Sequence, residues 1–156
     1  MIITADTNVL IRAAVRDDLT QSELAVRTLL EAEAVAVTLA SLCEFVWVLT
    51  RAYARKPAEI AASIRKLIEN ANMLVDRSAV DAGLAVLERG GDFADGVIAF
   101  EGRRLGGRTF VSFDLRAVDL VGATGGESRL LSTKWRCCPG VKLWPPNLRS
   151  GRLAVR

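Results

Sequence analysis

Short apolar segments alternate with amphipathic segments along this chain, and this alternation constrains the fold more than any other feature. The predicted strands are residues 2–5, 34–38, 72–76 and 108–114, with 128–131 as a fifth strand at an edge. The predicted helices are residues 20–32, 41–54, 57–70, 78–90, 92–107 and 115–121. Strands that alternate with helices are typical of a parallel sheet with helices on both faces. We therefore predict a three-layer α/β/α domain around a central parallel sheet of about five strands.

Capping residues and apolar spacing set the boundaries of the predicted helices. Leu24, Leu29 and Leu30 recur at helical spacing and predict the buried face of helix 20–32, which Thr20 or Ser22 would cap. Three further residues mark the ends of later helices: Ser78 as a cap, Gly90 as a stop, and Gly106 as the stop of helix 92–107.

The amino-acid composition excludes several catalytic mechanisms for this chain. The chain has 156 residues, enough for one well-packed domain, and it contains no histidine. The absence of histidine excludes Ser-His-Asp and Cys-His catalysis and most zinc sites. Three cysteines, of which two are adjacent, give no disulfide framework. Catalysis by this chain would depend on carboxylates, with a hard cation as their natural companion.

The last 24 residues differ in kind from the rest. Residues 133–156 carry six basic side chains, no acidic one and no regular apolar period. Fifteen basic and eighteen acidic residues remain in 1–132, so that part has a net charge of −3 despite the +3 of the whole chain. We predict a domain at 1–132, followed by a basic tail at 133–156 that is either a non-native extension or a functional appendage.

Five acidic residues occupy positions that meet at one edge of such a sheet. Asp6 and Asp114 end the first and fourth predicted strands. Asp92 and Asp95 begin a helix, and Glu44 lies near the start of another. Ligands bind at the carboxyl ends of parallel strands, and a divalent cation would relieve the repulsion among clustered carboxylates. Carboxylates that hold Mg²⁺ are standard apparatus for hydrolysing a phosphodiester.

Each candidate also has a purely structural interpretation. The carboxylates of Asp6, Asp92 and Asp114 could serve only as caps or turn formers, Asp95 could interact with a helix dipole, and Ser41 and Glu44 fit a capping box. Thr7 and Asn8 could orient Asp6 or cap the following helix, and Ser112 could support Asp114. We interpret Trp47 as a core residue rather than a platform for stacking bases.

The ordered set of motifs DTN, CEFVWVL, FADGVIAF and SFD resembles the PIN-domain family, and more closely its VapC-type toxin ribonucleases. The resemblance covers residues 1–132 and assigns four metal-binding acids to Asp6, Glu44, Asp95 and Asp114, with Asp92 as an accessory acid. It implies an endoribonuclease that depends on Mg²⁺ or Mn²⁺, an RNA substrate and a homodimer. It also implies a cognate VapB-type antitoxin, through which alone the complex would contact DNA. Gly96 departs from the family pattern, where helix formers are usual, and residues 133–156 have no family counterpart.

Two other functions compete with this interpretation. A catalytically inactive PIN-fold protein could use the acidic cleft to bind a basic partner. A phosphatase with an aspartyl nucleophile usually needs a second aspartate two residues after the first, but position 8 is Asn8. No apolar stretch suits a membrane helix and no signal peptide is predicted, so we expect a cytoplasmic protein.

Overall fold

The computed structural model describes residues 1–132 and contains the α/β elements that the sequence predicts. Its strands are β1 (Ile2–Thr4), β2 (Ala34–Ala36), β3 (Met73–Leu74), β4 (Thr109–Ser112) and β5 (Glu127–Leu130). Its helices are α1 (Thr7–Val15), α2 (Leu19–Glu31), α3 (Leu39–Arg51), α4 (Pro57–Ile68), α5 (Arg77–Leu87), α6 (Phe93–Arg104) and α7 (Leu115–Ala123). The predicted basic tail lies outside the described residues. Within residues 1–132, no helix is both long and apolar enough to span a membrane.

The strands divide between two parallel sheets. One sheet has the order β1-β2-β3, and the other consists of β4 and β5 alone. The α/β class, the three-layer α/β/α type and the parallel pairing are confirmed, whereas the larger sheet has three strands instead of the predicted five or so. The reason is tertiary: β1 and β4, which would have to pair to join the sheets, stand at separate edges.

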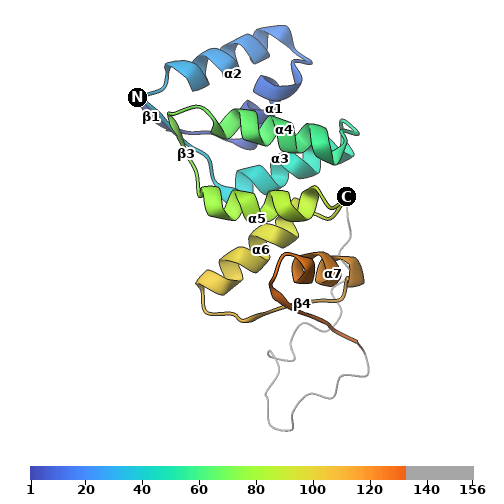
Figure 1. Ribbon diagram of the computed structural model, residues 1–156. Coiled ribbons are helices and arrows are strands. Elements are labelled where there is room, and N and C mark those ends of the chain that lie inside the picture. The colour runs from blue at the N-terminus through green and yellow to red at the C-terminus, as the bar shows by residue number, and fades with distance from the viewer. Residues whose placement is uncertain (133–156) are drawn as a thin grey trace, which may run out of the picture.

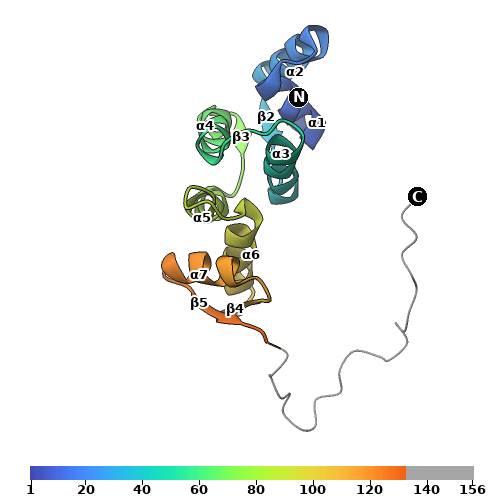
Figure 2. The same ribbon diagram turned by 90° about the vertical axis from the view of Figure 1, so that its right-hand side faces the viewer.

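Helices α5 and α6 lie between the two sheets. Figures 1 and 2 show α1 to α4 with the first sheet at one end of an elongated molecule, and α7 with β4 and β5 at the other. The main core gathers buried residues from α1 to α6 and the first sheet, among them Val35, Leu42 and Ile64. In a smaller cluster, Val121 of α7 packs with Val86 of α5 and Ala99 of α6. The second sheet is therefore held by these helices and not by the first sheet.

Several predicted helix boundaries and faces are wrong. The sequence assigned no helix to residues 7–15, where α1 forms, because its apolar period covers little more than two turns. Asp18 caps α2 and Asp76 caps α5, each upstream of the cap expected from the sequence. On α2, Leu29 is buried as predicted, but Leu24 and Leu30 are exposed. Only one narrow side of α2 packs on the core, so its apolar spacing overstates the buried face.

Two glycines bring α5 and α6 into close contact. A Cβ atom on Gly96 of α6 would lie 2.3 Å from the carbonyl oxygen of Ala82 and 2.8 Å from the Cα of Gly83. A Cβ atom on Gly83 of α5 would lie 2.5 Å from the ring of Phe93. The departure of Gly96 from the usual helix formers therefore has a packing reason, since no side chain fits at this crossing.

Candidate active site

Three of the predicted acids line one cavity between α3, α6 and α7. Its volume is about 430 Å³, and it is lined by Asp92, Asp95, Asp114, Trp47, Arg51 and Arg116, among others. The acids come from the start of α6 and from the turn that follows β4. The cavity therefore combines clustered negative charge with two guanidinium groups and one indole ring.

Asp92 and Asp114 are held in place by helix capping. The Oδ1 atom of Asp92 accepts a hydrogen bond from the backbone N–H of Ala94 at 3.0 Å. The Oδ1 atom of Asp114 accepts bonds from the N–H groups of Arg116 at 2.8 Å and Ala117 at 3.4 Å. These bonds fix each carboxyl group at the cavity wall. The same hydrogen bonds therefore cap the helices and place the two carboxyl groups in the cavity. The hydroxyl of Ser112 accepts a hydrogen bond from the backbone N–H of Asp114 at 3.0 Å, so Ser112 supports the turn at Asp114 through its backbone.

Asp95 is the least exposed of the three acids that line the cavity. Partial burial, followed by repulsion from Asp92 and Asp114, raises the pKa of the Asp95 carboxyl above its ordinary value. Burial disfavours the ionised form because the carboxylate loses water, and the two neighbouring charges act in the same direction. The Asp95 carboxyl therefore interacts with both of these neighbouring carboxyl groups.

The Asp95→Asn variant is expected to be more thermally stable than the wild type at neutral pH. The folded protein binds the Asp95 proton more tightly than the unfolded chain does. Stability therefore falls as the pH rises from the ordinary aspartate pKa to the raised one, and the penalty persists at higher pH. Thermal unfolding across pH should show a gain for Asp95→Asn at pH 7 and none below about pH 3, where both states are protonated. An equal gain at every pH would contradict this origin.

Asp6 and Glu44 form a second group, at the carboxyl end of β1. Asp6 precedes α1, but its side chain makes no capping hydrogen bond. Instead its Oδ2 accepts a bond from Asn8 Nδ2 at 3.3 Å, while Glu44 Oε2 accepts a bond from Thr7 Oγ1 at 2.7 Å. Asn8 thus contacts Asp6, which is one of the two roles considered for it, whereas Thr7 contacts Glu44. The cap of α3 is Thr38, which receives the N–H of Ser41, so the alternative capping-box role of Glu44 is not what this structure shows.

The Thr7→Val variant is expected to lower the free energy of unfolding by about 1–2 kcal/mol, because Glu44 loses a buried donor that a methyl group cannot replace. Thr7 is itself buried, with 4% of its surface exposed. Urea unfolding measures the change. The matched control is Thr20→Val, at an exposed position of α2, which should leave stability nearly unchanged. Equal effects of the two substitutions would mean that the bond to Glu44 contributes nothing.

The two groups of acids do not form a metal centre within the described part of one chain. Carboxylates are suitable donors for Mg²⁺ or Mn²⁺. Among residues 1–132, however, no three His, Cys, Asp or Glu side chains lie close enough together to hold a metal ion. The donor chemistry therefore fits a hard cation, but the predicted set of four acids is split between the end of β1 and the cavity beside α6.

Three residues of the cavity were missed or misjudged from the sequence. Trp47, which we interpreted as core, is 59% exposed and lines the cavity. Arg51 lies one helical turn further along α3, and Arg116 follows Asp114 by two residues. Their spacing from the acids was visible in the sequence, but exposed helical arginines rarely bind phosphates, so spacing alone did not single them out.

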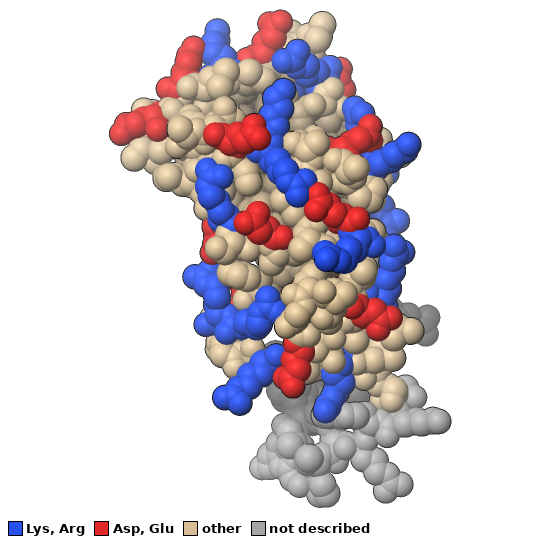
Figure 3. Space-filling view, in the orientation of Figure 1, with Lys and Arg blue, Asp and Glu red and all other residues tan. Residues whose placement is uncertain are grey.

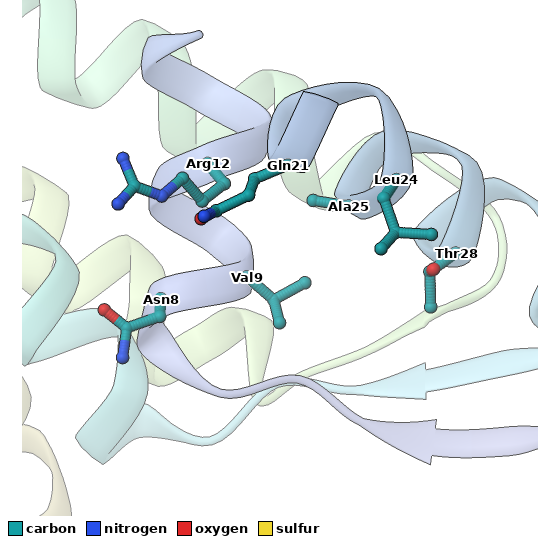
Figure 4. Close-up of a pocket in the computed structure, with 7 residues that line it drawn as sticks. All are labelled: Asn8, Val9, Arg12, Gln21, Leu24, Ala25 and Thr28. Atoms are coloured by element: carbon teal, nitrogen blue, oxygen red, sulfur yellow. The ribbon is translucent and has the colours of Figure 1, made fainter. Parts of the chain in front are cut away.

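Charge distribution and a second groove characterise other parts of the surface. Positive and negative side chains alternate over the face shown in Figure 3, so this face carries no large tract of one sign. A second groove of about 370 Å³ runs between α1 and α2, where Val9, Leu24 and Ala25 lie among polar residues (Figure 4). No carboxylate lines that groove, which leaves the cavity beside α6 as the better candidate for carboxylate chemistry.

Comparisons with known proteins identify the fold family. A family model described as the PIN domain matches residues 3–122. A search of curated proteins found no significant match. Among solved structures, the chain is similar to Mycobacterium tuberculosis VapC20, described as a sarcin-ricin loop cleaving toxin. That similarity has 18% sequence identity and a TM-score of 0.38, and it covers 81% of this chain and 96% of the other.

Proposed function

Because the chain belongs to the PIN domain family, we propose that it is a metal-dependent endoribonuclease and the toxin of a type II toxin–antitoxin pair. The observation that carries the proposal is the cavity that Asp92, Asp95 and Asp114 line together with Arg51 and Arg116. Acids alone would repel RNA. A cavity that also contains guanidinium groups and an exposed indole has the side chains needed to bind a nucleic-acid strand.

The chain's own residues supply binding and orientation. Arg51 and Arg116 are positioned to pair with phosphate oxygens, and the exposed face of Trp47 provides a surface on which a base can stack. Asp95 and Asp114, which line the same cavity, would hold Mg²⁺ or Mn²⁺, and Asp6 and Glu44 would complete the set of four acids if the end of β1 came closer to the cavity. When bound, such a cation lowers the pKa of a bound water and stabilises charge on phosphate oxygens. Thr7 and Asn8 donate hydrogen bonds to Glu44 and Asp6 and would hold these two carboxylates for that role.

We further propose a VapB-type antitoxin as the natural partner. A basic side chain from such a partner would neutralise the acidic cavity, because the repulsion that raises the Asp95 pKa would be relieved by a positive charge. DNA would be contacted only through that antitoxin. We place the complex in the cytoplasm, where RNA substrates are available.

Cleavage of total RNA by the purified, antitoxin-free chain tests the enzymatic proposal. Cleavage is expected with Mg²⁺ or Mn²⁺, and loss of cleavage is expected with excess EDTA and with Asp95→Asn. Because that variant is expected to fold at least as stably as the wild type at neutral pH, its inactivity would report the lost charge. Cleavage that resists EDTA would contradict the metal requirement.

The second candidate function is that of an inactive binding protein. It is favoured by the observation that the described residues of one chain bring no three ligands together. Under this alternative, the folded wild-type chain would bind RNA or a basic partner but would not cleave RNA with either cation. The aspartyl phosphatase alternative finds no support, since Asn8, and not a second acid, lies beside Asp6.

A further inference from the structure

The groove between α1 and α2 changes in polarity from one end to the other. Figure 4 shows Asn8, Arg12 and Gln21 gathered at one end. Leu24 and Thr28 lie toward the other end of the same groove. No acidic side chain of residues 1–132 lines it. The groove therefore joins a polar end with a guanidinium group to an apolar end with one hydroxyl group.

The polar end of the groove adjoins one of the acids proposed to bind the cation. Asn8 lines the groove, and its Nδ2 donates a hydrogen bond to Asp6 Oδ2 at 3.3 Å. Asn8 and Arg12 are four residues apart on α1, so their side chains lie on the same face of that helix. An RNA strand whose phosphate lies at Asp6 can therefore continue along α1 past Asn8 to Arg12.

The guanidinium group of Arg12 is held in a fixed orientation. Arg12 Nη1 donates a hydrogen bond to Asp17 Oδ1 at 2.5 Å, and the Tyr53 hydroxyl donates to Asp17 Oδ2 at 2.6 Å. The bond from Tyr53, followed by the bond from Arg12, holds the pKa of the Asp17 carboxyl below its ordinary value, so Asp17 stays ionised. A guanidinium group has five N–H donors, and the bond to Asp17 uses only one of them. Arg12 therefore keeps donors for a phosphate, and less entropy is lost when it binds one.

The apolar end of the groove suits a nucleobase. Val9 of α1 and Leu24 of α2 both line it, and Leu24 is 54% exposed although its side chain is large and apolar. Proteins bind an unstacked base between apolar or aromatic side chains and read it through hydrogen bonds to its edge. The Thr28 hydroxyl can both donate and accept such a bond. The groove volume of about 370 Å³ lies within the range of about 300–1,000 Å³ that small-ligand sites have.

We propose that this groove binds one nucleotide of the RNA strand, next to the phosphodiester bond that the acids cleave. The phosphate of this nucleotide contacts Arg12, and its base lies against Val9 and Leu24 with Thr28 at the base edge. The inference rests on the proposed function, because Asp6 determines where the neighbouring phosphate lies. The groove would then help to select the RNA sequence that is cut, separately from the cavity beside α6.

A nucleotide matches this groove better than an apolar protein helix does. Helices that dock in grooves present apolar side chains over at least two turns. Here such a helix would lie against Asn8, Arg12 and Gln21 along the polar half of the groove and would leave the Arg12 charge without an anionic partner. A nucleotide carries its charge at one end and its apolar ring at the other, as the groove does.

RNA binding in EDTA tests the subsite without cleavage. A fluorescent, short single-stranded RNA is titrated with the chain, and anisotropy gives Kd, with thermal unfolding as a check on folding. Arg12→Gln is expected to weaken binding by about tenfold or more, the usual effect of losing a hydrogen bond to a charged group. The matched control is Arg27→Gln, which removes the same charge from an exposed position of α2 outside the groove and should weaken binding by less than about twofold. Equal losses would mean that only net charge matters, and would overturn the proposal.

The apolar end offers a test that leaves every charge in place. Leu24→Ala is expected to weaken RNA binding by about threefold or more, because apolar surface against the base is lost. Leu30→Ala is the matched control on the same helix, where the side chain has similar exposure (62% against 54%) but does not line the groove. It should leave Kd unchanged. An unchanged Kd with Leu24→Ala would overturn the placement of the base.

Base preference gives a readout that a general loss of structure would not change in the same way. Thr28→Val removes the hydroxyl and keeps the shape of the side chain. Kd is measured with single-stranded RNA of adenosine, cytidine or uridine alone. The wild type is expected to discriminate among the three, and Thr28→Val is expected to reduce the differences. Equal discrimination by wild type and variant would contradict the role of Thr28.

Cleavage assays separate failure of the subsite from failure of the proposed function. Suppose that the wild type cleaves RNA with Mg²⁺ or Mn²⁺, but Arg12→Gln and Leu24→Ala bind and cleave like their controls. The proposed function would then stand, and the subsite would be contradicted. If both variants lose RNA binding relative to their controls but the folded wild type cleaves no RNA, the groove would be supported as an RNA-binding site and only the proposed function would fail.

Discussion

Asp114→Asn is expected to reduce RNA cleavage by roughly a thousandfold while leaving the fold intact. Electrostatic stabilisation at a phosphoryl oxygen is worth several kcal/mol, and each 1.4 kcal/mol or so corresponds to tenfold in rate. Asparagine is as good a helix cap as aspartate, so the bonds that Asp114 accepts from Arg116 and Ala117 can persist. The substitution therefore removes the charge and retains the local structure.

The measurement compares initial rates of RNA cleavage at one cation concentration, with thermal unfolding as a check on folding. Asp119→Asn is the matched control, because Asp119 lies on the exposed side of α7, five residues after Asp114. It should cleave at the wild-type rate. An Asp114→Asn chain that folds normally and cleaves within tenfold of the wild type would show that Asp114 is a cap and not part of the reactive site.

Gly96→Ala is expected to destabilise the protein by about 2 kcal/mol or more. In an ordinary helix interior the same change would stabilise by about 1 kcal/mol. Here the added methyl would lie 2.3 Å from the carbonyl oxygen of Ala82, and backbone atoms on α5 cannot move away as a flexible side chain would. Overpacking of this kind costs about 1–3 kcal/mol and outweighs the gain in helix propensity.

Thermal unfolding measures this effect, with an expected fall in the midpoint on the order of 5 °C. Gly102→Ala is the control on the same helix, since a Cβ atom there would meet nothing within 4 Å. That variant should be as stable as the wild type or more stable, by up to about 1 kcal/mol. Stabilisation by Gly96→Ala would show that α5 and α6 can separate enough to admit a side chain at this crossing.

The candidate site was only partly predictable from the sequence. Asp92, Asp95 and Asp114 were predicted from their places at helix starts and strand ends, and these three do meet in one cavity. Asp6 and Glu44 were assigned to the same site, but they lie together near Thr7, at the end of β1. Their assignment rested on a single continuous sheet, and whether β1 pairs with β4 depends on contacts between residues about a hundred positions apart.

At Trp47 and Gly96, too, the sequence alone did not predict the role of the residue. An aromatic residue at helical spacing is usually part of the core, yet α3 presents Trp47 to the cavity because its other side packs on the main core. A glycine within a helix looks unfavourable in sequence, and only the approach of α5 shows why a side chain is excluded there. The exposure of Trp47 and the lack of space at Gly96 both depend on how two elements pack against each other, and neither follows from the sequence of one helix alone.

The sequence by itself determined the alternation of strands and helices, the α/β class and the placement of acids at strand ends and helix starts. These features follow from local periodicity, capping and residue chemistry, which act over a few turns of chain. The tertiary structure decided which strand edges pair, which acids share a cavity and which residues line it. Those outcomes depend on how helices far apart in sequence pack, above all on the crossing of α5 and α6 that sets the second sheet apart from the first.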